Sequence, residues 1–199
     1  MKKLRLFLFA TTIILISMVS CSSRHNDMVP LPAPSVYYWK TVFKLDSIQK
    51  LFLKRHDIKK IYLRFFDVDL NEQQVPIPMG TVQFESKVPS EIHIIPVVYI
   101  ENHCLKEHCD LAQKIVSRVF TMASTNNMEI NELQIDCDWN NRSRLLYFEL
   151  LRDIKKLLDQ RGHFVLSATI RLHQLSQPAP PVDYGVLMCY NTGNIHDYN

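Results

Sequence analysis

Glycine is scarce in this chain: only 4 of its 199 residues are glycine. Such a composition argues against a fibrous or disordered protein, and the length is enough to bury one sizeable core. No glycine-rich loop follows the first expected strand, so a Rossmann-type nucleotide site is not supported. The sequence also lacks a broad basic patch or a run of like charges, and we therefore expect no nucleic-acid partner.

The apolar stretch near the start of the chain, residues 6–16, is too short to cross a bilayer. It follows a basic start and leads through residues 17–20 to Cys21, an order typical of a bacterial signal peptide over residues 1–20. The residues before Cys21 resemble the lipobox of bacterial lipoproteins. The first 20 residues hold three basic residues and no acid, so removing them takes the formal charge of +3 to near zero.

The lipobox resemblance implies a mature chain that begins at a lipid-modified Cys21 and continues through a polar, proline-bearing tether at residues 21–34. Such a protein would be anchored to the membrane of the bacterial cell envelope through its lipid. Ser22, rather than aspartate, after the lipid-bearing cysteine favours the outer membrane. Cleavage at another site would instead give a soluble secreted protein, and this alternative stays open. In either case the folded domain is expected over residues 35–199.

Short runs of apolar, β-branched and aromatic residues alternate with segments of helical period after the tether. Residues 70–90 contain three prolines and no helical period, which predicts an extended loop where the alternation would place a helix. The pattern predicts an α/β fold with a parallel sheet covered on both sides. We expect helices at residues 45–55, 111–122 and 143–160, and strands at residues 36–43, 61–69, 92–100, 133–140, 164–172 and 185–191.

Polar residues collect at the carboxyl ends of these expected strands, which is where an α/β barrel builds its active site. We therefore prefer a (β/α) barrel of the TIM type. A complete barrel of this type has eight strands, so the chain is expected to hold a barrel truncated after about six strands. A compact open-sheet domain is the alternative.

Two carboxylates, Asp136 and Asp138, share one face of the strand expected at residues 133–140. Unpartnered carboxylates in a core would cost several kcal/mol, so a strand that carries them is expected to end at a functional rim. The alternative is structural: the pair caps the next helix or binds an arginine. The expected strand at residues 61–69 ends in a similar pair, Asp67 and Asp69.

Four cysteines remain after Cys21, and two of them lie in a short His- and Cys-containing segment, residues 103–109. Two thiols and two imidazoles suit zinc, but structural zinc sites usually bring two such pairs together from separate segments. We therefore expect no metal site. Cys104 and Cys109 are expected either to form a local disulfide or to remain two free thiols. Cys137 and Cys189 lie in apolar strand patterns and are expected in the core.

Residues 135–140, Ile-Asp-Cys-Asp-Trp-Asn, resemble the strand-four signature of the family 18 glycoside hydrolases, the chitinase-like barrels, which reads Asp-x-Asp-x-Glu. Residues 188–191, Met-Cys-Tyr-Asn, resemble the strand-six motif of the same family, Met-x-Tyr-Asp. The family's general acid is the glutamate that ends the first motif, and Asn140 takes its place here. Leu133 and Asn191 also replace family aspartates. The chain therefore looks closer to a group of uncharacterised bacterial lipoproteins that share a glycosidase-like barrel.

This resemblance implies a glycan ligand and leaves three hypotheses open. The first is a glycoside hydrolase in which Asp138 is the acid or electrostatic stabiliser and Asp136 shifts its pKa. The second is a carbohydrate-binding lipoprotein without catalysis, and the third is an inactive barrel fragment. No cofactor is expected. The remaining candidate substrate-binding residues are Asp67, Asp69, Glu101, Asn140, Arg171, Tyr190 and Asn191.

Overall fold

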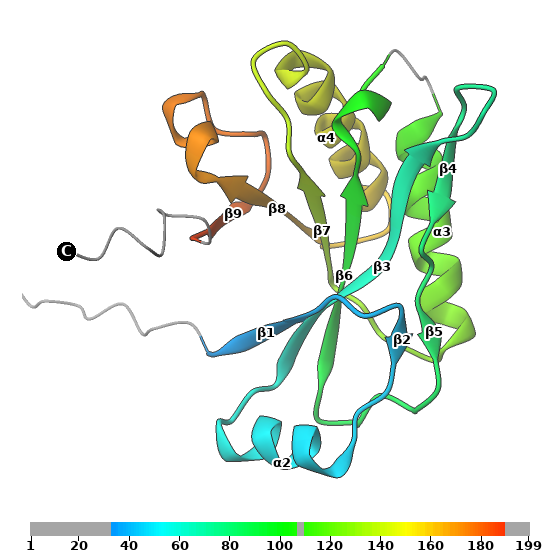
Figure 1. The fold of residues 1–199 in the computed structure, drawn as a ribbon, viewed down its shortest axis with the longest axis vertical. Helices are drawn as coiled ribbons and strands as arrows, with labels where there is room; N and C mark the ends of the chain where they lie inside the picture. Colours follow the sequence, from blue (N-terminus) through cyan, green and yellow to red (C-terminus); the bar gives the residue numbers. More distant parts are fainter. Residues whose placement is uncertain (1–32, 107–109, 190–199) are drawn as a thin grey trace, which may run out of the picture. The chain divides into compact units, whose positions relative to one another are not determined.

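Six parallel strands follow one another across the main sheet in the order of the chain (Figure 1). The structure is a computed structural model, and it describes residues 33–106 and 110–189. From one edge of the sheet to the other, the strands are β1 (Ser35–Tyr38), β3 (Lys60–Leu70), β6 (His93–Ile100), β7 (Glu132–Cys137), β8 (Val165–Arg171) and β9 (Tyr184–Met188). This order confirms the predicted α/β class and the parallel sheet.

The sheet is curled into a half barrel. The Tyr62 hydroxyl on β3 lies 2.9 Å from the Tyr184 hydroxyl on β9, although β6, β7 and β8 separate the two strands. In a flat sheet, four strand spacings of about 4.8 Å would hold these backbones about 19 Å apart with their side chains roughly parallel. The side chains can therefore meet only across a concave face. The prediction of a barrel-like sheet of about six strands is confirmed at this level.

Two helices cover the convex face of the sheet. α3 (Leu111–Thr125) and α4 (Arg144–Asp159) lie side by side there (Figure 1). α4 buries Tyr147, Leu151 and Ile154 completely, as its 3.6-residue period predicts. Alternate residues of β7 face these helices: Leu133 and Ile135 are in the main core cluster. The intervening residues of β7 therefore face the concave side.

A β-bulge in β3 decides which face its carboxylates take. Arg64 pairs with Val97 of β6 and Phe66 pairs with Val98, so Phe65 is an extra residue between them. Phe65 and Phe66 both point into the main core, and the alternation restarts after them. As a result, Asp67 returns to the concave face that Arg64 occupies.

The segment after β3 contains strands in place of the predicted irregular loop. β4 (Pro76–Met79) pairs antiparallel with the end of β3. β5 (Gln83–Phe84) pairs with β2 (Val42–Phe43) in a small second sheet. The single strand predicted at residues 36–43 is wrong, because the chain leaves β1 after Tyr38 to form β2. The absence of a helix over residues 70–90, all of which the structure describes, is confirmed.

The short helix α2 (Ser47–Arg55) follows β2 and begins with a capping box between Asp46 and Gln49. Its position agrees with the prediction, but its apolar stripe faces outward. Ile48 and Leu51 are 78% and 65% exposed, whereas Leu53 is buried. The helical period thus located α2 without identifying the face that contacts the rest of the fold. None of the helices described is long and apolar enough to span a bilayer.

Candidate functional site

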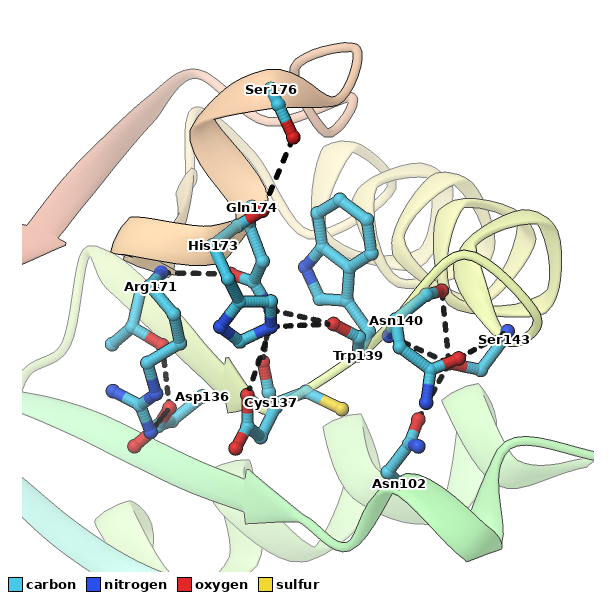
Figure 2. Close-up of polar contacts among 12 residues, drawn as sticks. Asn102, Asp136, Cys137, Trp139, Asn140, Ser143, Arg171, His173, Gln174 and Ser176 are labelled. Atoms are coloured by element: carbon cyan, nitrogen blue, oxygen red, sulfur yellow. Dashed lines mark hydrogen bonds and ion pairs between the residues drawn. The ribbon is translucent and has the colours of Figure 1, made fainter.

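The carboxylate of Asp136 lies almost completely buried at the carboxyl end of β7 and is held by two residues of β8. Its Oδ1 atom accepts hydrogen bonds from Thr169 Oγ1 at 2.5 Å and from Arg171 Nη2 at 2.8 Å (Figure 2). Burial raises the pKa of Asp136, and the negative charges of Asp138 and Asp67 add to this, while Thr169 and Arg171 oppose it. The structural alternative, in which Arg171 neutralises Asp136, is thus present in the geometry.

The turn η2 (Leu172–Ser176) fixes the chain that leaves β7. Gln174 accepts a hydrogen bond from the backbone of Arg171 at 2.8 Å and donates to the carbonyl of Trp139 at 2.9 Å (Figure 2). Next to it, His173 Nε2 lies 3.4 Å from Asp138 Oδ1. The Asp138 and His173 side chains are 55% and 57% exposed. They therefore form a solvent-accessible acid and imidazole pair beside the buried pair of Asp136 and Arg171.

Asn140 holds the turn that leads into α4. Its Oδ1 atom accepts hydrogen bonds from the backbone N–H groups of Arg142 at 2.9 Å and Ser143 at 3.4 Å. The Ser143 hydroxyl in turn donates to Asn102 at 2.6 Å (Figure 2). Asn140, a candidate for substrate binding, therefore acts as a turn residue. Trp139, which follows the motif's second aspartate, is buried against Tyr147 and is not available to a ligand.

Asp67 forms a bidentate ion pair with Arg64 of the same strand. Both nitrogens Nε and Nη2 of Arg64 donate to the carboxylate, and this bond raises the pKa of the guanidinium. Gly80 covers the pair: a Cβ atom at that position would lie 2.9 Å from Arg64 Nη2, and its φ of +53° suits glycine. Arg64 also donates to the carbonyl of Trp39 at 3.5 Å.

An aromatic stack lies beside this ion pair. Trp39 follows β1 and stacks on Tyr37, with ring centroids 5.7 Å apart and planes inclined by 6°. Tyr37 stacks in turn on Tyr62, at 4.9 Å. Trp39 is 41% exposed, so one end of the stack reaches solvent.

Asp69 does not contact Asp136 or its partners and instead pairs with a histidine in the turn after β6. His103 Nε2 lies 2.7 Å from Asp69 Oδ1, and the pKa of Asp69 is lowered by this contact and by the backbone N–H of Leu70. Cys104 is buried beside them. Burial and the charges of Asp69 and Glu101 raise the pKa of the Cys104 thiol to about 11.

The concave face carries a polar network that the motif analysis missed. Glu132 accepts hydrogen bonds from the hydroxyls of Tyr184, Ser167 and Tyr62. Gln134 accepts from Tyr37 at 2.7 Å and donates to Ser167 at 3.2 Å. The signal was present in the sequence, because Glu132, Gln134 and Asp136 alternate along one strand and so share one face. The sequence-based prediction considered only the carboxylates at the end of this strand.

The structure brings four of the nine candidate catalytic and substrate-binding residues into one group. Asp136, Arg171 and Asp138 lie together, and Asp67 is near enough to influence the pKa of Asp136. Asp69 and Asn140 have other partners. Glu101 directly follows β6. Burial raises the pKa of Tyr99 to about 12, and the charges of Glu101 and other nearby carboxylates contribute to this. The other candidates, Tyr190 and Asn191, lie outside the described residues, as does the candidate lipidation site, Cys21.

The three described cysteines, Cys104, Cys137 and Cys189, are free thiols. Cys137 is buried in the core as expected, whereas Cys189 is exposed, so its expected core position is wrong. Cys109 lies outside the described residues. Comparison of the chain with protein-family models and with curated protein sequences found no match.

Proposed function

We propose that the rim formed by the carboxyl ends of β1, β3, β7 and β8 binds a carbohydrate without cleaving it, in a lipoprotein of the bacterial cell envelope. The observation that carries this proposal is the exposed end of the Trp39 stack beside the ion pair of Arg64 and Asp67. A sugar ring presents C–H groups on its faces and hydroxyl groups around its edge. A half-exposed aromatic ring next to a guanidinium and its carboxylate partner complements both parts.

The half barrel supports a relationship to TIM barrels. Inside such barrels, side chains from alternate strands meet in layers of four. Tyr62, Glu132 and Tyr184 meet in this way, and they come from the second, fourth and sixth strands of the sheet, β3, β7 and β9. Three members of such a layer are therefore in contact, which favours a TIM-type barrel as the finer description of the fold. The carboxyl ends of the strands are the ligand-binding side of that fold.

Binding is favoured over hydrolysis by the state of the carboxylates. A glycosidase needs one carboxyl group that donates a proton and a second that acts as nucleophile or base. Asn140, in the acid position of the resembled family, cannot donate a proton in this way, and its side chain is used in a turn. Asp136 is buried and bonded to Thr169 and Arg171.

One observation favours hydrolysis as a second candidate. Burial and the neighbouring Asp138 both raise the pKa of Asp136, which is the direction that general acid catalysis requires. In this reading Asp136 is the proton donor and the exposed Asp138 is the second carboxylate. Both functions use the same rim, so one experiment can separate them.

The test is a combined glycan-binding and hydrolysis screen on the chain from Ser22 onward. Trp39→Ala and Asp138→Asn change the proposed ligand contacts. Phe52→Ala and Asp57→Asn are matched controls, because both are exposed residues in or next to α2, away from the rim strands. We expect a bound glycan, at least tenfold weaker binding in the two rim variants, unchanged binding in the controls, and no product.

Two outcomes would replace or reject this function. Product release that disappears in Asp138→Asn would establish the hydrolase instead of the binding protein. Failure of the wild-type protein to bind any glycan, while it unfolds cooperatively, would reject a carbohydrate site. The lipid anchor is tested separately by metabolic labelling with an alkyne fatty acid, which should label the wild-type chain and leave Cys21→Ser unlabelled.

A further inference from the structure

A second cluster of polar side chains lies at the same end of the sheet and has no role in the proposed glycan site. Asp69 ends β3, and His103 and Cys104 lie in η1 (Asn102–Cys104), the turn after β6. Their ligand atoms, the carboxylate oxygen, the imidazole nitrogen and the sulfur, all lie within 4.8 Å of one another. His103 and Cys104 lie 34 and 35 positions after Asp69 in the chain, so the fold brings them together.

Backbone hydrogen bonds hold the three side chains in this arrangement. The N–H of Glu101 donates to the carbonyl of Val68 at 3.1 Å, which joins the end of β6 to the end of β3. The N–H of Cys104 donates to the Glu101 carbonyl at 2.8 Å. The Cys104 sulfur itself lies 3.5 Å from the Val68 carbonyl oxygen. The turn is thereby fixed next to Asp69, whose carboxylate accepts the N–H of Leu70 at 2.7 Å.

We propose that Asp69, His103 and Cys104 bind one divalent transition-metal ion, with Zn²⁺ as the best match to this donor set. Thiolate, imidazole and carboxylate are the three side-chain ligands that Zn²⁺ takes, and together they disfavour Mg²⁺ and Ca²⁺, which prefer oxygen. The hydrogen bond between His103 and Asp69 holds the two groups together before the metal enters. On binding, the Cys104 proton leaves to solvent and its sulfur becomes a ligand.

The distances fit a tetrahedral ion after small movements. Ligand bonds of about 2.0 to 2.3 Å place neighbouring ligand atoms about 3.3 to 3.7 Å apart. The 2.7 Å contact between His103 and Asp69 must therefore open by somewhat less than 1 Å, and the sulfur must approach. The Asp69 and His103 side chains are 42% and 56% exposed, so they are free to adjust while Cys104 stays in place. Three protein ligands leave a fourth position for water or for a donor group of a ligand.

The experiment is a Co²⁺ titration of the reduced full chain, followed by Zn²⁺ competition. Co²⁺ bound to a thiolate gives an intense charge-transfer absorption band, which a merely structural thiol does not give. We expect one equivalent of Co²⁺ to produce this band and Zn²⁺ to displace it. Cys104→Ser should abolish the band, and His103→Ala or Asp69→Ala should weaken the apparent affinity at least tenfold.

Matched variants separate this site from the other thiols and imidazoles of the chain. Cys189→Ser and His93→Ala each change an exposed residue outside the cluster and should leave the titration unchanged. If Cys104→Ser does not fold, the two exposed ligands, His103 and Asp69, still test the proposal. Absence of the band in the wild-type chain would overturn it. So would a band that survives in Cys104→Ser but disappears in Cys109→Ser.

Discussion

At the scale of single residues, the state of Asp136 is set by a balance between burial and two donors on β8. Burial raises its pKa, whereas Thr169 and the Arg171 guanidinium lower it. Because the net shift is upward, an ionised Asp136 costs free energy in the folded state. That cost is fully present above the raised pKa and disappears as the pH falls through it toward the ordinary value of an unfolded aspartate.

The variant Arg171→Met tests this balance. At pH 7 the free energy of unfolding should fall by about 3 kcal/mol, because the variant leaves a buried carboxylate without its cation. The loss should shrink as the pH falls through the pKa of Asp136, since a protonated carboxyl group needs no cation. Urea unfolding at neutral and acidic pH measures both effects. The double variant Asp136→Asn/Arg171→Met should recover most of the loss, and an equal loss at both pH values would contradict the argument.

At the scale of elements, α2 shows that a helix can be amphipathic and still bury only part of its apolar surface. Leu53 is buried at 6% exposure, while Leu51 in the same helix is 65% exposed. The two leucines have identical helix propensity and differ only in environment. They form a matched pair for measuring what the contact of α2 with the fold contributes.

Leu53→Ala should lower the free energy of unfolding by about 3 kcal/mol, because it removes buried methyl groups and leaves a cavity. Leu51→Ala should change it by no more than about 0.5 kcal/mol, since that side chain is in solvent. Chemical denaturation of both variants gives the comparison. A similar loss for both would mean that Leu51 is covered in solution, for example by a second copy of the chain, and sedimentation would then show self-association.

The same element shows what the sequence could predict and what it could not. Periodicity located α2, α3 and α4, because apolar spacing is a local property. The face that α2 buries depends on its neighbours, which no local pattern contains. The bulge at Phe65 was missed for the same reason: two adjacent phenylalanines are compatible with an unbroken strand. Asp136 was recognised as unusual, but its partner Arg171 lies 35 residues away, so both readings of the carboxylate stayed open.

At the scale of the whole described unit, the curvature of the sheet depends on contacts across its concave face. Glu132 lies almost buried on β7 and binds hydroxyl groups from β3, β8 and β9. Lys60 approaches its other carboxylate oxygen at 3.7 Å. Because Tyr62 and Tyr184 belong to strands that are neighbours neither of β7 nor of each other, their bonds to Glu132 stabilise the curl and not the pairing of adjacent strands.

Tyr184→Phe should lower the free energy of unfolding by about 1 to 2 kcal/mol, since it removes a hydroxyl bonded to a buried carboxylate. Local stability should fall most at β9, the last strand of the described sheet and the one that carries Tyr184, so its backbone amides should exchange with deuterium faster than in the wild-type protein. Tyr99→Phe is the control, because the Tyr99 hydroxyl has no part in the Glu132 network. Equal exchange of β9 in both variants would contradict a role for this network in holding the curl.

The bulge at Phe65 gives β3 one residue more than its neighbour β6 over the same length of sheet. Phe65→Leu would keep the extra residue and leave the following side chains in place. Deleting Phe65 would remove the bulge and place Phe66 directly after Arg64, so plain alternation would keep Phe66 in the core and Asp67 on the concave face. The strand therefore carries one spare position: an in-frame loss of the Phe65 codon would cost one core ring and leave both carboxylates, Asp67 and Asp69, on the face they already occupy.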